Sequence, residues 1–209
     1  MRKIKKVIQE EGVRGLFSRL YYRLKFRLAG VDFVSEELPA DARALKHGGD
    51  ARPMVSTSVH LIYYLMTKTA PRDMDITEGT FVDLGCGKGG PLYAAHKLGF
   101  QRVVGVEFTS RFYEIACDNM KRLGATDVEV RNGDAADFQF PTDLRLLFMF
   151  NPFGEDVMRD VCLNLAQHVS NKYLIFYDFP MCRQIIESEL APRIVYEQPD
   201  GHLVVYEIN

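Results

Sequence analysis

The sequence predicts an α/β fold: a mainly parallel, seven-stranded sheet with helices on both faces, a C-terminal antiparallel hairpin and an N-terminal helical extension. Three observations support this prediction. Short apolar runs alternate with amphipathic stretches from residue 80 onward, which is typical of a parallel sheet covered by helices. A glycine-rich turn follows the first of these runs. The last two runs are joined through Pro199-Asp200-Gly201, which indicates a hairpin.

Apolar spacing and turn signals give the individual elements. Each predicted strand is short, rich in apolar residues and bounded by polar or glycine-containing turns: Thr80–Leu84, Arg102–Glu107, Asp127–Asn132, Leu144–Phe150, Lys172–Asp178, Arg193–Gln198 and His202–Ile208. Helices are predicted between the strands, at Pro91–Leu98, Ser110–Leu123, Glu155–His168 and Cys182–Leu190. Pro91 suits the first turn of its helix, where its missing N–H costs nothing.

The chain divides into residues 1–70, a helical extension and lid, and residues 71–209, a cofactor-binding domain. Residues 1–28 have helical periodicity, and Gly12 and Gly15 are expected to split them into two helices. One face is apolar: Phe17, Leu20, Tyr21, Leu24 and Leu28. Either the segment packs on the domain with a solvated basic face, or it docks on anionic lipid or another acidic partner. Part of the apolar stripe is expected to cover the cofactor cleft.

Residues 29–53 are rich in glycine and proline and are expected to be mostly loop, with a short helix at Pro39–Lys46. A further helix is expected to begin at Ser56 or Ser58, either of which can cap it, and to end at Thr69.

Composition and charge narrow the function classes. The 209 residues are 47% hydrophobic, and the net charge is −2, which makes nucleic acid an unlikely partner for the molecule as a whole. Residues 1–28 hold nine basic and two acidic residues, a balance of +7, so the total of −2 leaves −9 for the remainder. The four cysteines form no C-x-x-C pair, which argues against zinc and against a disulfide framework. We expect a cytoplasmic protein without a transmembrane segment, with peripheral contact at the inner membrane surface as the role open to residues 1–28.

The segment Phe81–Gly90 carries the strongest functional signal. Gly85, Gly87 and Gly90 fit G-x-G-x-x-G, and Glu107 follows 22 residues after Gly85, as in dinucleotide-binding proteins. Asp83 argues against that reading, because its carboxylate would lie close to a pyrophosphate and suits a cationic ligand instead. A nicotinamide-dependent oxidoreductase, using NAD or NADP, remains the alternative enzyme class.

The pattern Asp-x-Gly-x-Gly-x-Gly at residues 83–89 resembles the first motif of class I S-adenosylmethionine-dependent methyltransferases. The resemblance covers residues 80–209 and includes the terminal hairpin. It implies a Rossmann-like fold with S-adenosylmethionine as cofactor. It also implies that Glu107 accepts hydrogen bonds from the ribose and that Asp134 lies next to the adenine amino group. The implied cofactor-binding residues are Asp83, Gly85, Cys86, Gly87, Gly89, Glu107, Phe108, Asp134, Ala135 and Asn151.

Asn151-Pro152-Phe153 follows the fourth strand and resembles the Asn-Pro-Pro-Tyr/Phe motif of amino-methyltransferases, with one proline in place of two. The resemblance implies that the Asn151 side-chain oxygen and the Pro152 carbonyl accept hydrogen bonds from a target amine, while Phe153 stacks on a planar substrate. Together with the glycine loop, this segment is also similar to a group of small bacterial methyltransferases and to the histone-lysine methyltransferases of the silencing-disruptor type.

Three further residues are candidates for substrate positioning or proton removal. Tyr177 and Asp178 end the fifth strand beside the same pocket, and His60 lies on the predicted lid helix. A sulfonium is already an activated methyl donor, so in-line displacement is expected to need no metal. The protein aligns the acceptor, excludes water and removes a proton.

The sequence therefore favours methyl transfer to a nitrogen or oxygen of an unidentified small-molecule or protein acceptor. Besides the oxidoreductase, the alternative is a docking module that keeps the cofactor-binding fold without turnover. The presence of Asp83, Glu107 and Asp134 favours a working cofactor site.

Overall fold

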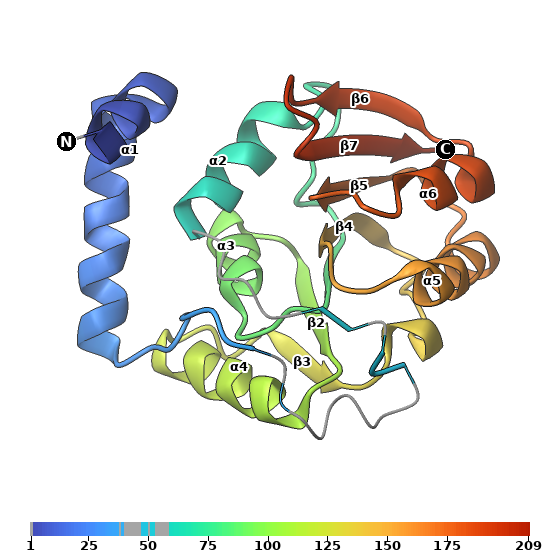
Figure 1. Ribbon diagram of the computed structural model, residues 1–209, viewed down its shortest axis with the longest axis horizontal. Coiled ribbons are helices and arrows are strands. Elements are labelled where there is room, and N and C mark those ends of the chain that lie inside the picture. Colours follow the sequence, from blue (N-terminus) through green and yellow to red (C-terminus); the bar gives the residue numbers. More distant parts are fainter. Residues whose placement is uncertain (1, 38, 40–46, 50, 53–58) are drawn as a thin grey trace.

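The computed structural model of the protein describes residues 2–37, 39, 47–49, 51–52 and 59–209. Seven strands form one sheet in the order β3-β2-β1-β4-β5-β7-β6 (Figure 1). Strands β1 to β5 are parallel, and β7 is antiparallel to both of its neighbours. The predicted α/β fold and its C-terminal hairpin are confirmed. The strands are β1 (Thr80–Leu84), β2 (Arg102–Glu107), β3 (Glu129–Asn132), β4 (Leu144–Phe150), β5 (Tyr173–Asp178), β6 (Arg193–Glu197) and β7 (Leu203–Ile208).

Helices cover both faces of the sheet, as expected. Helices α2, α3 and α4 contribute to the core on one face, and α5 and α6 contribute to the core on the other. Their bounds differ from the predicted ones by a few residues at most. Among the described residues the helices are α1 (Arg2–Ala29), α2 (Val59–Thr69), α3 (Gly90–Leu98), α4 (Ser110–Arg122), α5 (Glu155–His168) and α6 (Arg183–Leu190), and the 3₁₀ turn η2 spans Ala135–Asp137.

The central strands are buried on both faces. In β4, Leu146 and Phe148 pack towards α2 and α3, whereas Leu147 and Met149 pack towards α5 and α6. A strand buried in this way is an almost unbroken apolar run and lacks the alternation of a half-exposed strand. This is why β4 is so clear in the sequence.

The strand order fixes where a ligand can bind. From β1 the chain builds outward to β3 and then crosses back to place β4 on the other side of β1. Ligands of such sheets bind at the carboxyl ends of the strands, where the order reverses. In this protein that point lies beyond the ends of β1 and β4, near Gly85 and Asn151.

The N-terminal segment forms one helix, α1, from Arg2 to Ala29. The prediction of two helices divided at Gly12 and Gly15 is wrong. A glycine inside a helix costs about 1 kcal/mol relative to alanine, and this cost alone does not end the helix. The helix ends where the backbone turns left-handed, at Gly30, whose φ is +66°.

The face of α1 that meets the domain is not the predicted apolar stripe. The rings of Tyr22 and Phe26 contact Tyr93 of α3, with centroids 6.4 and 5.8 Å from it, and Lys25 donates a hydrogen bond to the Tyr93 hydroxyl. The expectation that the stripe covers the cofactor cleft is therefore wrong. Its residues are between 52% and 78% exposed: Phe17, Leu20, Tyr21, Leu24 and Leu28.

Two predicted helices lie partly or almost wholly outside the described residues. The short helix expected at Pro39–Lys46 lies almost wholly outside the described residues, and so does the start of the helix expected from Ser56 or Ser58. The described part of that second helix is α2, which packs against α3.

Gly105 in β2 tests how closely α3 packs on the sheet. A Cβ at this position would lie 2.5 Å from Leu92 Cδ1 and 2.8 Å from Cys86 Sγ. We expect Gly105→Ala to lower the free energy of unfolding by about 1–3 kcal/mol, because the added methyl group overpacks the core. Urea denaturation measures the change. Gly49→Ala is the matched control, since its Cβ would meet nothing within 4 Å. Equal stability of the two variants would contradict the close packing.

Candidate active site

A pocket of about 1000 Å³, counting its open mouth, lies at the carboxyl ends of the parallel strands. Most of the predicted cofactor residues line it: Asp83, Gly85, Cys86, Gly87, Glu107, Phe108, Asp134 and Ala135. Gly89 and Asn151 are not in the wall, although both adjoin residues that are.

The glycine loop bends closely around the end of β1. Gly85, Gly87 and Gly89 have φ values of +73°, +54° and +87°, which residues with side chains rarely adopt. A Cβ on Gly85 would lie 2.5 Å from Pro152 Cβ, so this glycine also lets the loop after β4 approach. Gly89 is the N-cap of α3, so the helix begins directly after the glycine loop.

Asp83 is a buried carboxylate in the wall of the pocket. The residue is 1% exposed, and its Oδ2 has no hydrogen-bond partner among the described residues. Burial raises the pKa of Asp83 well above its ordinary value, and the charge of the neighbouring Glu107 raises it further. An unpaired acid in a pocket wall fits a ligand that brings a positive charge, as the methionine moiety of S-adenosylmethionine does.

Glu107 is held by the backbone around it. Its Oε2 accepts a hydrogen bond from the Gly87 N–H and its Oε1 from the Thr109 N–H, each at 2.8 Å. Burial raises the pKa of Glu107, and these backbone hydrogen bonds offset part of that rise. A carboxylate has about four acceptor positions, and these two hydrogen bonds occupy two of them. The arrangement fits a ribose diol.

Asp134 has a partner that the sequence analysis did not foresee. Its Oδ1 accepts a hydrogen bond from the Ala136 N–H at the start of η2, and its Oδ2 lies 2.7 Å from His47 Nδ1. His47 also lines the pocket. The two residues are 87 positions apart, and a single histidine in a loop-rich segment gives no signal of such a pairing.

The segment after β4 combines backbone strain with an unpaired acceptor. Asn151 has a φ of +38°, and its Oδ1 is buried without a hydrogen-bond partner among the described residues. The Pro152 carbonyl already accepts a hydrogen bond from the Arg52 N–H at 3.3 Å. Phe153 is 6% exposed and forms part of the pocket wall. Asn151 is thus the member of this motif whose hydrogen-bonding capacity is most clearly unused.

Tyr177 and Asp178, the two candidate catalytic residues at the end of β5, have different surroundings. Tyr177 is fully buried, and its hydroxyl accepts a hydrogen bond from the Cys182 N–H at 3.1 Å, so it belongs to the core. Asp178 is half-buried and pairs in register with Phe150, a pocket residue. Burial raises the pKa of Asp178 to about 6. Neither residue lines the pocket itself. The third candidate base, His60, lies in α2, but its side chain is outside the described residues.

An aromatic group lies beside Asp178. Phe179 has a φ of +51°, is 43% exposed, and stacks on His202 with a centroid separation of 4.6 Å. Its ring is 5.3 Å from that of Phe150. Two strained residues, Asn151 and Phe179, therefore follow the paired ends of β4 and β5. Strain of this kind is often found at functional sites.

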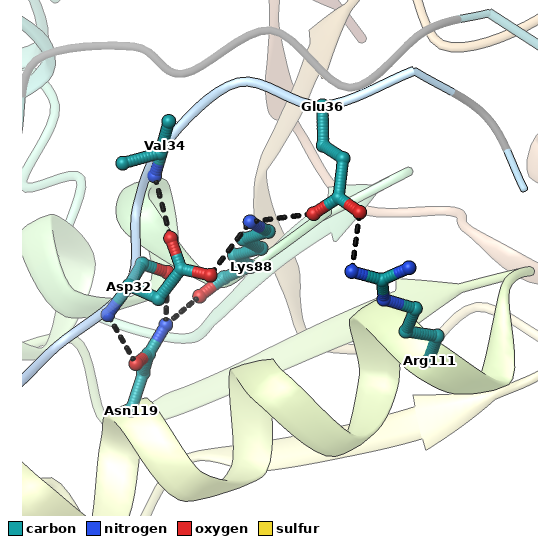
Figure 2. A network of polar contacts seen from close by, with 6 residues as sticks. All are labelled: Asp32, Val34, Glu36, Lys88, Arg111 and Asn119. Carbon is teal, nitrogen blue, oxygen red and sulfur yellow. Dashed lines mark hydrogen bonds and ion pairs between the residues drawn. The ribbon is translucent and has the colours of Figure 1, made fainter.

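A segment before the sheet domain closes one side of the pocket. We call residues 31–37 the strap. Its Phe33 lines the pocket, and polar contacts join its Asp32 and Glu36 to the glycine loop and to α4 (Figure 2). The sequence analysis expected only a loop here.

Comparison with known proteins agrees with this geometry. Residues 81–172 match a family model described as a methyltransferase domain. Ribosomal protein L11 methyltransferase of Tolumonas auensis is 41% identical over 54 residues, which is 26% of this chain and 18% of that relative. The chain thus matches less than a fifth of the relative's length.

Solved structures share the fold. An RNA methyltransferase from Salinibacter ruber, in complex with S-adenosyl-L-homocysteine, is 24% identical with a TM-score of 0.55, over 74% of this chain and 92% of that one. A ribosomal protein L11 methylase from Lactobacillus delbrueckii subsp. bulgaricus is 21% identical with a TM-score of 0.52, over 71% and 76%. Residues 81–172 thus match a methyltransferase domain, and the chain has the fold of solved methyltransferases, one of which was crystallised with S-adenosyl-L-homocysteine, in agreement with the fold that the sequence predicts.

Proposed function

We propose that the protein transfers the methyl group of S-adenosylmethionine to an amine nitrogen of a protein acceptor, without a metal. The observation that supports this most is Asn151: a buried, unpaired amide oxygen on a strained backbone, directly after β4. An oxygen in that state suits an N–H donor, because a buried acceptor left unpaired costs about 1–3 kcal/mol. Two similar proteins are named as methyltransferases of a ribosomal protein and of RNA, and these names also favour a macromolecular acceptor.

We propose that the pocket residues divide between the two substrates. Asp83 pairs with the ammonium group of the cofactor, Glu107 accepts from its ribose, and Asp134 lies at its adenine. The cofactor supplies a methyl group already activated by its positive sulfur. Asn151 would orient the acceptor nitrogen in line with that methyl group, so that the nitrogen could displace the sulfur as leaving group. Asp178 takes the proton that the nitrogen loses.

The raised pKa of Asp83 predicts that cofactor affinity depends on pH. A raised pKa means that the free protein holds this proton to a higher pH than an exposed aspartate does, and a cationic ligand favours the ionised form. We therefore expect the affinity for S-adenosylhomocysteine to increase as the pH rises through that pKa, with release of a proton on binding. Calorimetry in buffers of different ionisation enthalpy measures the release. Asp83→Asn should weaken binding and abolish the proton release. Identical proton release in this variant would assign the titration to another group.

The role proposed for Asn151 predicts that its substitution affects methyl transfer more than cofactor binding. We expect Asn151→Ala to keep its affinity for S-adenosylhomocysteine within about threefold, a change of less than ~0.7 kcal/mol, and to lose most methyl transfer. The assay uses S-adenosylmethionine with a labelled methyl group and intact bacterial ribosomes, which are then separated into protein and RNA. Label in protein that resists mild alkali supports an N-methylated protein, whereas alkali-labile label indicates an ester and label in RNA contradicts the proposed acceptor. Equal losses of binding and transfer would place Asn151 at the cofactor.

We also propose that α1 docks on an anionic lipid surface. No helix in the described part of the chain is long and apolar enough to cross a membrane. The exposed apolar stripe of α1 suits an interfacial position instead, and it extends to Val13, which is 57% exposed. Arg23 and Arg27 are exposed on the same helix, within a segment of net charge +7. Two copies of this segment would repel each other, and an RNA would leave the leucines unpaired, so lipid is favoured.

Vesicle co-sedimentation tests the docking. We expect the protein to pellet with vesicles of phosphatidylglycerol and phosphatidylcholine at low salt and to be released by high salt, because each basic residue contributes about 1 kcal/mol near such a surface. Leu20→Glu/Leu24→Glu should abolish pelleting. Leu163→Glu is the matched control, since Leu163 is a leucine of α5 that is 51% exposed. Absence of pelleting at low salt, or equal pelleting of all variants, would reject the proposal.

A further inference from the structure

Lys88 is a member of the glycine loop whose ammonium group pairs with the strap. Its Nζ lies 2.8 Å from Asp32 Oδ2 and 3.0 Å from Glu36 Oε2, both in the strap. The residue is only 3% exposed. In Figure 2 its side chain lies between these two carboxylates, above α4. A buried ammonium needs such partners, because breaking a buried ion pair by removing one member costs about 3–5 kcal/mol.

Asn119 of α4 fixes the backbone of the same region. Its Oδ1 accepts a hydrogen bond from the Asp32 N–H at 3.0 Å, and its Nδ2 donates to the Asp32 carbonyl at 2.7 Å and to the Lys88 carbonyl at 2.9 Å. One buried amide thus joins the strap to the glycine loop through three main-chain groups. All of its hydrogen-bonding groups are used, so no other side chain can replace it without loss.

The charges around Lys88 balance. Lys88 and Arg111 face Asp32 and Glu36, and Arg111 Nη2 lies 2.5 Å from Glu36 Oε1. Burial alone would raise the pKa of Asp32, but hydrogen bonds from Lys88 and from the Val34 N–H lower it below its ordinary value. Arg111 is 61% exposed, so its pair with Glu36 contributes little. Lys88 and Asn119 are therefore the main attachments of the strap.

These attachments position a wall of the cofactor pocket. Phe33 directly follows Asp32, lines the pocket, and packs edge-on against Phe26 of α1 with ring centroids 5.0 Å apart. Because Phe33 is the next residue in the chain, the contacts that fix the backbone of Asp32 also fix the position of Phe33. The strap thus contributes one wall residue to the pocket and is joined to the glycine loop beside it.

We propose that Lys88, Asp32, Glu36 and Asn119 form a latch that seats the strap against the glycine loop, and that these four are positioning residues for the cofactor. They act through Phe33 and through the Lys88 carbonyl, and their side chains do not contact the cofactor. If the strap is seated in only a fraction of the molecules, the apparent affinity for the cofactor falls by that fraction. The latch keeps the fraction high before the cofactor arrives. The inference rests on the cofactor and is independent of the acceptor.

Calorimetry with S-adenosylhomocysteine tests the latch from both sides. We expect Lys88→Met, which changes the loop side, and Asp32→Asn/Glu36→Gln, which changes the strap side, to weaken binding by about tenfold or more, the equivalent of ~1.4 kcal/mol. The combination of all three should bind no more weakly than Lys88→Met, because it breaks the same contact. Arg102→Gln is the matched control, since it removes an exposed ion pair with Glu129 elsewhere on the surface. Wild-type affinity in the strap-side variant would overturn the proposal.

A second variant and a second measurement separate positioning from folding. Phe33→Ala leaves the latch intact and should still weaken binding and speed dissociation. Hydrogen exchange of residues 31–37 should slow when S-adenosylhomocysteine binds to the wild-type protein, and less so in the strap-side variant. Wild-type affinity of the Phe33→Ala variant would reject the latch even if the charge variants fail to fold. So would hydrogen exchange of residues 31–37 that does not change when the ligand binds. Failure of the wild-type protein to bind the probe would reject the cofactor as well.

Discussion

Two carboxylates buried at neighbouring strand ends constrain the rest of the pocket. Asp83 and Glu107 are 1% and 6% exposed, and removing charges of this kind from water costs several kcal/mol each unless other groups compensate. Glu107 is compensated by two backbone N–H groups, one of which, from Gly87, is presented by the left-handed glycine loop. Oδ2 of Asp83 has no hydrogen-bond partner among the described residues, and under the proposed function a cationic ligand would compensate its charge. The left-handed glycine loop therefore serves a second purpose besides turning the chain, since it brings the Gly87 N–H to a buried carboxylate.

The sheet and its loop could be predicted because their signals are local. Doubly buried strands such as β4 are continuous apolar runs, and three alternate glycines after an acid mark the turn that follows β1. Strand ends in a parallel sheet lie at one edge, so Asp83, Glu107 and Asp134 could be placed together from the sequence alone. The motif residue Asn151 could be placed near them, but its strained backbone could not be foreseen.

The strap could not be predicted, because polar contacts between distant residues leave no periodic pattern. The pair of Lys88 with Asp32 spans 56 positions, and the pairs of Asn119 with Asp32 and of His47 with Asp134 each span 87. Nothing in residues 29–53 distinguishes a loop that closes a pocket from one that does not. The glycine in the middle of β2 is similar: Gly105 is required by the approach of Leu92 and Cys86, which only the packed structure reveals.

Helix α1 shows a different limit of sequence reasoning. Periodicity identifies an apolar stripe but not the direction in which it points, and α1 has apolar residues on two faces. Tyr22 and Phe26 found aromatic partners in the domain, which left the longer stripe outside. Glycines at positions 12 and 15 carried a cost that the rest of the helix outweighed.

The contact between Phe26 and Phe33 joins the helix to the pocket wall. Phe26 belongs to α1 and Phe33 to the strap, so one aromatic pair joins the outer helix to the wall of the pocket. Two binding events that meet at a common contact obey thermodynamic reciprocity. Whatever factor the occupancy of α1 applies to cofactor affinity, the cofactor must apply to the affinity of α1 for its partner. The protein would then sense its methyl donor at the same surface through which it is held.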